Sequence, residues 1–187
     1  VNTGATTNLA GNVTLGASGK TITVPAGATI TNNGTQTGFG GANTPYFEAN
    51  MSATQTLSDA TWTKLNYNTE VFDSASAYDT SNYRFTPQTA GKYFCYLQVV
   101  FDAQALDVYH RSRASIVKNG SFYKRQIHDN YDNYYGYATT GYISAVIDFN
   151  GSSDYIEAYG YFDLTSGTGR INSGNESIFG AYKIIEW

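Results

Sequence analysis

The sequence predicts an all-β protein, in which an antiparallel sandwich of short strands follows a Thr- and Gly-rich N-terminal segment. Thr, Tyr, Val, Ile and Phe recur in short runs that end in Gly, Asn or Ser, a composition typical of strands and turns. Apolar residues make up 41% of the 187 residues, which is enough for a core, whereas charged residues make up only 14%. No stretch shows a clear 3.6-residue apolar period, so we expect no amphipathic helix.

The first 34 residues carry a rough internal repeat of about eight residues, in the segments NVTLGASG, KTITVPAG and ATITNNGT. Each unit alternates large apolar residues with threonine and closes in a glycine turn, which predicts a solenoid-like or intertwined β-stalk over residues 1–34. The alternative is a disordered Thr/Gly linker. The large apolar residues of the three repeat units are Val13, Leu15, Ile22, Val24 and Ile30.

These few apolar side chains cannot offset the entropy of ordering about forty residues, at roughly 1–2 kcal/mol each. An ordered stalk therefore has to be covered by other copies of the chain. This is the first indication of an oligomer, and it makes the five residues candidates for a trimer interface.

Residues 35–45 are predicted to be a neck, and residues 46–187 a head domain. The head begins with a strand at YFEANM (46–51), and TKLNYNTEVFD (63–73) contains another. KYFCYLQVVF (92–101) is almost wholly apolar, as expected of a central strand covered on both faces. SIFGAYKII (177–185) is predicted to be the last strand.

Two Asn-Gly pairs lie between strand-like runs, and each predicts a hairpin because both central residues of such a turn need a positive φ. The first is Asn119-Gly120, within residues 113–127, and the second is Asn150-Gly151, within residues 141–162. Eight or so strands in about 140 residues fit a jelly roll or a similar antiparallel sandwich.

Residues 78–96, YDTSNYRFTPQTAGKYFCY, resemble the signature of the complement and tumour-necrosis-factor-like jelly-roll family. The matching residues are Tyr78, Asp79, Phe85, Pro87, Gly91, Tyr93 and Phe94, and later Phe179 and Gly180 of the last strand. Where the family has a turn glycine this chain has Tyr83, and we expect the neighbouring Asn82 to take the left-handed conformation. The resemblance covers roughly residues 46–187 and implies a homotrimer.

Residues 13–35 are similar to stalk segments of bacteriophage tail-fibre and other virion proteins. The leading hypothesis is a non-enzymatic virion fibre protein on the virion surface. Its trimeric head would attach to a host cell-surface receptor, and its stalk would bind other virion proteins. The alternatives are a structural capsid or baseplate decoration protein without receptor binding, and a secreted complement-like trimeric binding module.

Tyrosine suits a subunit interface, because it has a flat apolar ring and a hydroxyl that finds a partner. In the head, Tyr96, Tyr142 and Tyr159 are therefore candidates for the trimer interface, together with the apolar residues of the stalk. The alternative is that such tyrosines fill the interior of the sandwich.

The segment HDNYDNYYGYATTGY (128–142), which we call the Tyr-rich segment, holds five of the 17 tyrosines and no large aliphatic residue. Tyr and Asn together are the composition of adaptable binding loops, so this segment is predicted to contact a host glycan or protein. The alternative is that it packs on a neighbouring subunit. The candidate receptor-binding residues are Tyr131, Asp132, Asn133, Tyr134, Tyr135 and Tyr137.

Other functions find less support in the sequence. A net charge of −4 without clusters of Lys and Arg argues against nucleic acid binding. No apolar run reaches the length of about 18 residues that a membrane-spanning helix needs. We expect a chain that begins at Val1 to be a processed or partial product.

Catalytic and metal-binding sites are not expected. The carboxylates Asp129 and Asp132, and a second group formed by Asp148, Asp154 and Glu157, are best explained as solvated turn residues. Cys95, the one cysteine, is predicted to be a buried, inert thiol. His110 and His128 lack a third ligand at metal-binding spacing. We expect no cofactor; the alternative, which the resemblance raises, is calcium bound by loop carboxylates, with no ligands assigned.

Overall fold

The computed structural model describes residues 18–31, 43–106, 108–130 and 136–184. The chain divides into two units, residues 1–39 and 40–187, and the division falls within the predicted neck. In the first unit, residues 18–31 are exposed and contain turns at Gly19 and Gly27 but no strand. The apolar residues of this segment are therefore exposed in a single chain. That several chains together form an ordered stalk remains a prediction.

The second unit is a sandwich of two sheets, and β7 lies at the centre of the first, sheet A. One side of β7 pairs with β10 over its whole length, and the other pairs with β13 and, near its end, with β12. β1 and β4 extend the sheet beyond β13, and β2 extends it beyond β12. The strands of sheet A are β1 (Tyr46–Met51), β2 (Gln55–Leu57), β4 (Thr69–Asp73), β7 (Gly91–Asp102), β10 (Ala138–Phe149), β12 (Gly169–Ile171) and β13 (Gly174–Lys183).

The second sheet, sheet B, has the order β5-β6-β11-β8-β9, and β3 also pairs with β11. Its strands are β3 (Thr63–Lys64), β5 (Tyr78–Asp79), β6 (Arg84–Phe85), β8 (Tyr109–Lys118), β9 (Ser121–Asp129) and β11 (Ile156–Leu164). Every strand pair of both sheets is antiparallel, so the predicted all-β antiparallel jelly-roll sandwich is confirmed. The described residues contain no helix that could cross a membrane.

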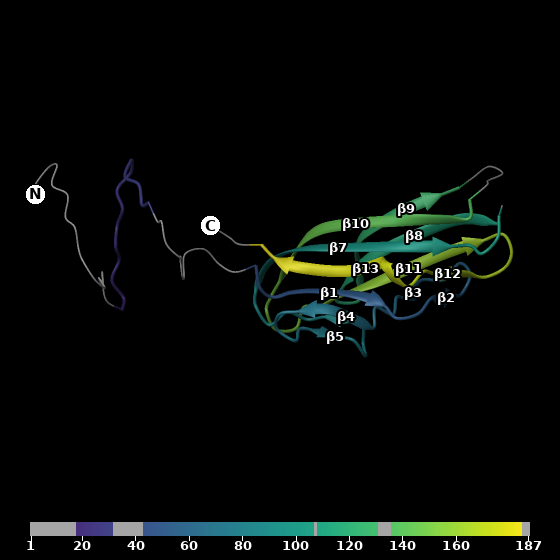
Figure 1. The fold of residues 1–187 in the computed structure, drawn as a ribbon, viewed down its shortest axis with the longest axis horizontal. Helices are drawn as coiled ribbons and strands as arrows, with labels where there is room; N and C mark the ends of the chain where they lie inside the picture. Colours follow the sequence, from purple (N-terminus) through teal and green to yellow (C-terminus); the bar gives the residue numbers. More distant parts are fainter. Residues whose placement is uncertain (1–17, 32–42, 107, 131–135, 185–187) are drawn as a thin grey trace, which may run out of the picture. The chain divides into compact units, whose positions relative to one another are not determined.

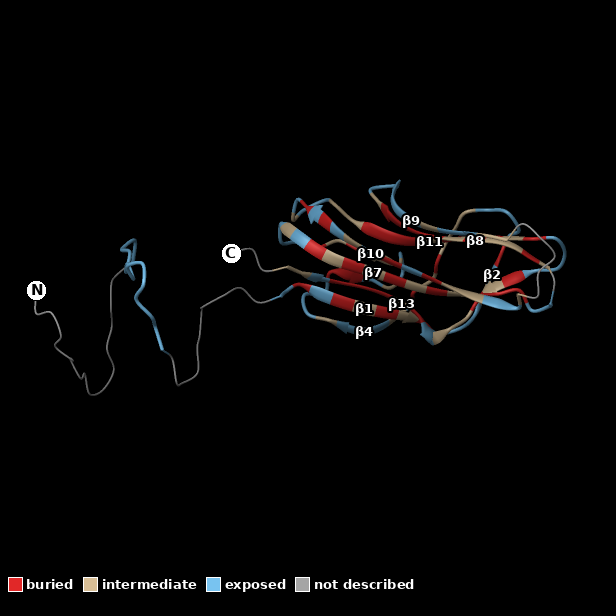
Figure 2. Cartoon of the chain, turned by 90° about the horizontal axis from the view of Figure 1, so that it is seen from above, coloured by how far each residue is buried: buried red, intermediate tan, exposed pale blue. Residues whose placement is uncertain are grey.

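The core lies between the two sheets, where Figure 2 shows the buried segments of both layers facing each other. Phe47 of β1 is fully buried, and its ring packs against Tyr78, Phe85 and Phe179 at centroid distances of 4.6, 4.3 and 5.2 Å. The Tyr78 hydroxyl donates to the carbonyl of Tyr67 at 2.6 Å, so its polar end is satisfied within the core. The aromatic residues of the signature thus form the centre of the sandwich.

Only some of the turns have the backbone conformation that the sequence predicts. Asn119 and Gly120 have φ values of 49° and 78° and join β8 to β9, so the first predicted hairpin is confirmed. In the turn of the signature, however, Tyr83 itself has a positive φ of 52°, and the expectation that Asn82 would take this conformation is wrong. The Asp79 carboxylate accepts hydrogen bonds from the backbone N–H groups of Ser81 and Asn82. These bonds hold Asn82 in the part of the turn that precedes the residue with positive φ.

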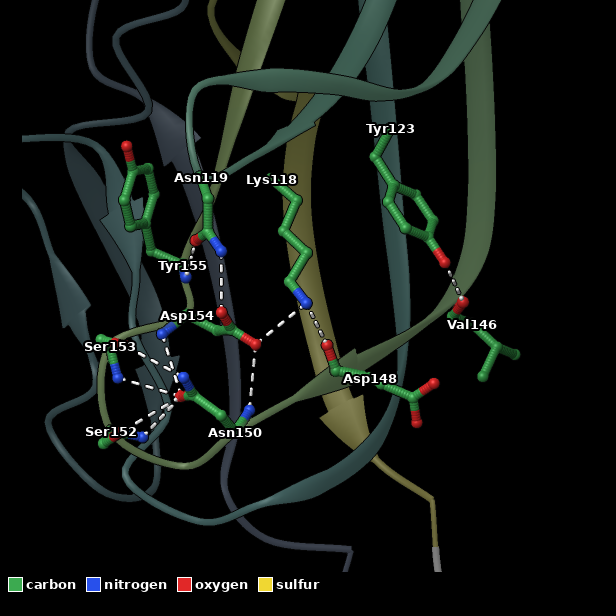
Figure 3. A network of polar contacts seen from close by, with 10 residues as sticks. All are labelled: Lys118, Asn119, Tyr123, Val146, Asp148, Asn150, Ser152, Ser153, Asp154 and Tyr155. Atoms are coloured by element: carbon green, nitrogen blue, oxygen red, sulfur yellow. Dashed lines mark hydrogen bonds and ion pairs between the residues drawn. The ribbon is translucent and has the colours of Figure 1, made fainter.

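The second predicted hairpin, at Asn150-Gly151, is wrong. β10 pairs with β7 of sheet A and β11 pairs with β8 of sheet B, so residues 150–155 cross from one sheet to the other. The Asn150 side chain caps this crossing, as Figure 3 shows: its Oδ1 accepts from the backbone N–H groups of Ser152, Ser153 and Asp154. Asn-Gly marks a turn here as well, but the pairing of the flanking strands decides that the turn is a crossing.

Different segments of the chain lie at the two ends of the head. The chain enters and leaves at the same end, where Lys183 N donates to Pro45 O at 3.1 Å. Figure 1 shows that β9 ends and β10 begins at the end opposite the entry point, so β9 runs away from the entry point and β10 runs back toward it. We call these the entry end and the distal end of the head.

Candidate functional site

The described flanks of the Tyr-rich segment are held by backbone hydrogen bonds at the distal end. Asn130 N donates to His110 O at 2.8 Å, and Ala103 N donates to Tyr137 O at 2.8 Å. Tyr137, one of the candidate receptor-binding residues, is exposed. The other five candidates, Tyr131, Asp132, Asn133, Tyr134 and Tyr135, lie outside the described residues.

A packed aromatic base supports these flanks. Tyr109 is buried, its ring meets that of His128 edge to face at 5.6 Å, and its hydroxyl lies 2.9 Å from Ser112 Oγ. Burial raises the pKa of Tyr109, so its hydroxyl stays protonated at neutral pH. A Cβ at Gly136 would lie 3.1 Å from the Tyr109 ring, so the chain approaches this base closely within the Tyr-rich segment.

A second candidate surface is the outward face of sheet A, which we call the sheet-A face. Side chains on this face alternate with core residues along each strand, so β7 presents apolar residues on both of its faces. Ring contacts of 5.4 Å between Phe94 and Tyr182, and of 5.5 Å between Tyr46 and Phe72, continue the aromatic surface across neighbouring strands. The apolar residues of the sheet-A face are Tyr46, Phe72, Phe94, Tyr96, Tyr142, Val146, Ile178 and Tyr182.

A depression of about 280 Å³ lies on this face, between the side chains of Tyr96, Gln98, Tyr142 and Ile178. Tyr142 is the most exposed of them, at 66%. A contiguous apolar surface with a hollow in it is typical of a site that another protein surface covers. The predicted interface residues Tyr96 and Tyr142 both belong to it.

Tyr96 is held in place by its neighbours on the face. Its ring lies over Gly180, where a Cβ would come within 2.3 Å of the ring, and its hydroxyl donates to Glu48 Oε2 at 2.7 Å. Burial, and the bond to the Glu48 carboxylate, raise the pKa of Tyr96. The Phe-Gly pair of the last strand thus has a physical reason, since only glycine leaves room for this tyrosine.

The other predicted interface residues are not part of the sheet-A face. Tyr159 lies on β11, on the outward face of sheet B, where its register partner is Lys64. Ile22, Val24 and Ile30 are exposed in the N-terminal unit, and Val13 and Leu15 lie outside the described residues. Sequence reasoning missed most of the face, although the signal was present: a strand that is apolar at consecutive positions has to cover two surfaces.

The second group of candidate carboxylates has structural partners in the described part of the chain. Asp154 Oδ1 accepts from Asn119 Nδ2 at 2.7 Å, and its Oδ2 lies 2.9 Å from Lys118 Nζ, as Figure 3 shows. These bonds, that of Asn119 foremost, lower the pKa of Asp154, which suits a fixed anion and not a general acid. The Asp148 side chain is highly exposed and forms a surface pair with Lys92.

Glu157 is a buried anion that joins two strands to β11. Its Oε1 accepts from Lys64 Nζ at 2.6 Å and from Arg84 Nη2 at 2.7 Å. Two cations on one carboxylate oxygen make Glu157 an ion-pair anchor between β11, β3 and β6. In the first group, Asp129 pairs with Arg113 at 3.2 Å, and Asp132 lies outside the described residues.

No group of three or more His, Cys, Asp or Glu side chains lies close enough to hold a metal ion within residues 18–31, 43–106, 108–130 and 136–184. Calcium binding therefore remains a prediction without assigned ligands. Cys95 is fully buried on the core face of β7, so the prediction of a buried cysteine is confirmed, and burial raises the pKa of its thiol, as an unreactive thiol requires.

Neither a protein-family model nor a curated protein matches this chain. Several solved structures, however, are similar to it. The globular domain of zebrafish complement 1qA protein is 11% identical, with a TM-score of 0.55 over 75% of this chain and 97% of that one. Murine APRIL is 14% identical, with a TM-score of 0.56 over 75% and 98%. Eiger TNF from S. frugiperda is 12% identical, with a TM-score of 0.51 over 76% and 95%. The head of this protein therefore has the jelly-roll fold of the complement 1q and tumour necrosis factor domains.

Proposed function

We propose that this protein is a virion fibre protein of the phage tail-fibre type, and that its trimeric head attaches to a receptor on the host cell surface. The observation that carries the proposal is the direction of the strands that flank the Tyr-rich segment. The chain enters the head at Pro45, and β9 ends and β10 begins at the opposite, distal end (Figure 1). A head carried on a stalk would thus hold its most tyrosine-rich segment at the end away from the stalk.

The sheet-A face supports a trimer. A free head would leave this aromatic face in water, whereas a neighbouring copy would cover it and fill its depression. A different surface, the side formed by the edge strands β9 and β10, also exposes apolar residues, among them Tyr123 and Ile127. When one copy's side packs on the next copy's face, the contact is heterologous, and contacts of this kind form a ring where the rotation between copies closes. The family resemblance implies that the ring has three members.

The same assembly accounts for the N-terminal unit. Three copies side by side would bring three Thr/Gly-rich segments together, so that Ile22, Val24 and Ile30 of each copy could be covered by the other two. The exposure of these side chains in the single chain is the expected state before assembly. The stalk would then join the head to other virion proteins.

Attachment is tested with the full chain, labelled and applied to a panel of bacterial strains. Staining of particular strains, and protection of those strains from phage infection by the unlabelled protein, would support the proposal. The double variant Tyr134→Ala, Tyr135→Ala should lose staining while it keeps the wild-type mass in light scattering. Tyr155→Ala, at the entry end, is the matched control. Unchanged staining by the double variant would sink the receptor role of the segment.

The trimer is tested independently by light scattering at micromolar protein. Val146→Asp places a charge on the sheet-A face and should convert the assembly to smaller species. Val71→Asp is the control, because Val71 has nearly the same exposure, 50% against 49%, but lies on β4 at the other side of the sheet. A folded wild-type monomer would refute the trimer. A particle that carries the protein while the protein stains no cells would favour the decoration alternative.

A further inference from the structure

The arginines of this acidic protein are gathered on one surface. Four of the five, Arg84, Arg111, Arg113 and Arg125, lie on the outward face of sheet B together with Lys64. Three carboxylates on that face pair with four of these five cations: Glu157 with Lys64 and Arg84, Asp163 with Arg111, and Asp129 with Arg113. These five cations outnumber the three carboxylates that pair with them, although the whole chain has a net charge of −4.

Of these five cations, Arg125 is the one that pairs with no carboxylate among the described residues. It lies on β9 opposite Ser115, and its side chain is exposed. The guanidinium carbon lies 5.2 Å from the centroid of the Phe122 ring, so the group is held over an aromatic face and not by an anion. A guanidinium in this state keeps its hydrogen-bond donors available for a bidentate contact with an incoming carboxylate.

The Phe122 ring beside this arginine belongs to a group of three aromatic rings. Trp62 precedes β3 and lies across the sheet, with its ring 4.7 Å from that of Phe122 on β9 and 5.5 Å from that of Tyr161 on β11. Between these two strands β8 carries the small, buried Ser115, which leaves room for the indole. The Arg113 guanidinium lies 5.5 Å from the Tyr161 ring, so cations border the aromatic group on both sides.

This surface has the two elements that an acidic sugar requires. The faces of aromatic rings carry partial negative charge and attract the C–H groups of a sugar ring stacked on them. A free guanidinium beside the rings matches one carboxylate per sugar residue. We infer that the Trp62, Phe122, Tyr161 and Arg125 surface binds a carboxylate-bearing glycan. It is a second binding surface, separate from the Tyr-rich segment, and it lies on the outward face of sheet B, opposite the sheet-A face.

The inference is tested by calorimetric titration of the full chain with two pairs of probes. Tri-galacturonate is compared with its methyl ester, and sialyllactose with lactose, so that each acidic sugar has a neutral counterpart and the two sources of carboxylate are told apart. We expect at least one acidic probe to bind with a Kd of about 1 mM or tighter, at least tenfold more tightly than its neutral counterpart. Equal binding of the acidic and neutral forms, or binding of neither acid, overturns the inference.

Variants locate the site. Arg125→Ala should weaken binding of the acidic probe at least tenfold, and Arg125→Lys should recover only part of it because a point charge lacks the bidentate geometry. Lys124→Ala is the matched control, since this neighbour is also exposed and cationic but its side chain alternates to the other face of β9. Equal loss in both alanine variants would refute a specific site.

The aromatic part is tested by Trp62→Ala, which should lower the affinity for the acidic probe by a similar factor, with circular dichroism and light scattering as checks on fold and assembly. Undiminished affinity in this variant would refute the stacking role. These outcomes are independent of the proposed function. Loss of sugar binding with unchanged staining of cells would refute the acidic glycan as the receptor, whereas absence of staining with intact sugar binding would refute host attachment.

Discussion

Glu157 allows the sharpest test of the energetics of the head. It is a nearly fully buried carboxylate, 3% exposed, and it accepts hydrogen bonds from Lys64 Nζ, Arg84 Nε and Arg84 Nη2 at 2.6, 2.8 and 2.7 Å. The three residues lie on different strands, β11, β3 and β6, so this one anion joins short strands that share few backbone pairs with β11. Removing it leaves two cations next to each other at the edge of the sheet.

The Glu157→Gln substitution keeps the shape of the side chain and removes its charge. Removing one partner of a buried ion pair lowers the free energy of unfolding by about 3–5 kcal/mol. The side chains of Lys64 and Arg84 are 27% and 37% exposed, so solvent screens part of the loss and the lower value of about 3 kcal/mol applies. For a chain of this size, about 3 kcal/mol corresponds to a Tm lowered by roughly 6–12 °C.

The assay is differential scanning calorimetry at one fixed concentration of protomer, because assembly makes Tm depend on concentration. The matched control is Asp148→Asn, which removes a carboxylate that is 76% exposed and paired with Lys92 at 3.3 Å. An exposed pair of this kind contributes about 0–1 kcal/mol, so the control should move Tm by no more than about 4 °C. Equal shifts for the two variants would refute the reasoning that burial makes Glu157 the stronger anchor.

Two further predictions concern the crossing between the sheets. Gly151→Ala should cost at least about 3 kcal/mol in urea unfolding, because the new Cβ would lie 2.3 Å from Ala90 N in addition to the strain of the positive φ. Gly167→Ala has the same sign of φ and open space around it, so it should cost only about 1 kcal/mol, and a similar cost for both would exclude the clash as the cause. Asp154→Asn should destabilise the protein by about 1–2 kcal/mol at pH 7. Since the folded pKa of Asp154 is lowered, its contribution is present above the unfolded pKa of about 3.9 and is lost as the pH falls through the folded value. The difference between wild type and Asp154→Asn, followed by unfolding at several pH values, should therefore be constant above about pH 5 and shrink below about pH 4, and a difference that grows on acidification would contradict this assignment.

The sequence by itself determined the class of the fold and the positions of its main strands. Alternation of apolar and polar residues marks β10 as a strand with one core face, and its side chains Ile143, Ile147 and Phe149 are buried. The predicted strand at 46–51 coincides with β1, and the Asn119-Gly120 hairpin has the predicted backbone. These features depend on interactions between residues close in the chain, or on which face of a strand is apolar, and both can be read from local pattern.

Only the tertiary structure decided which strands lie side by side. The Asn150-Gly151 turn has the same letters as the hairpin at Asn119, yet it crosses between sheets because its flanking strands pair with β7 and β8. Tyr96 and Tyr142 come together on the sheet-A face, whereas Tyr159 belongs to the other sheet. The surface around Arg125 combines residues from β9, β11 and the segment before β3, and their proximity follows from strand order. Strand order depends on long-range pairing, which local sequence patterns do not encode, so the candidate sites could be assigned only when the sheets were known.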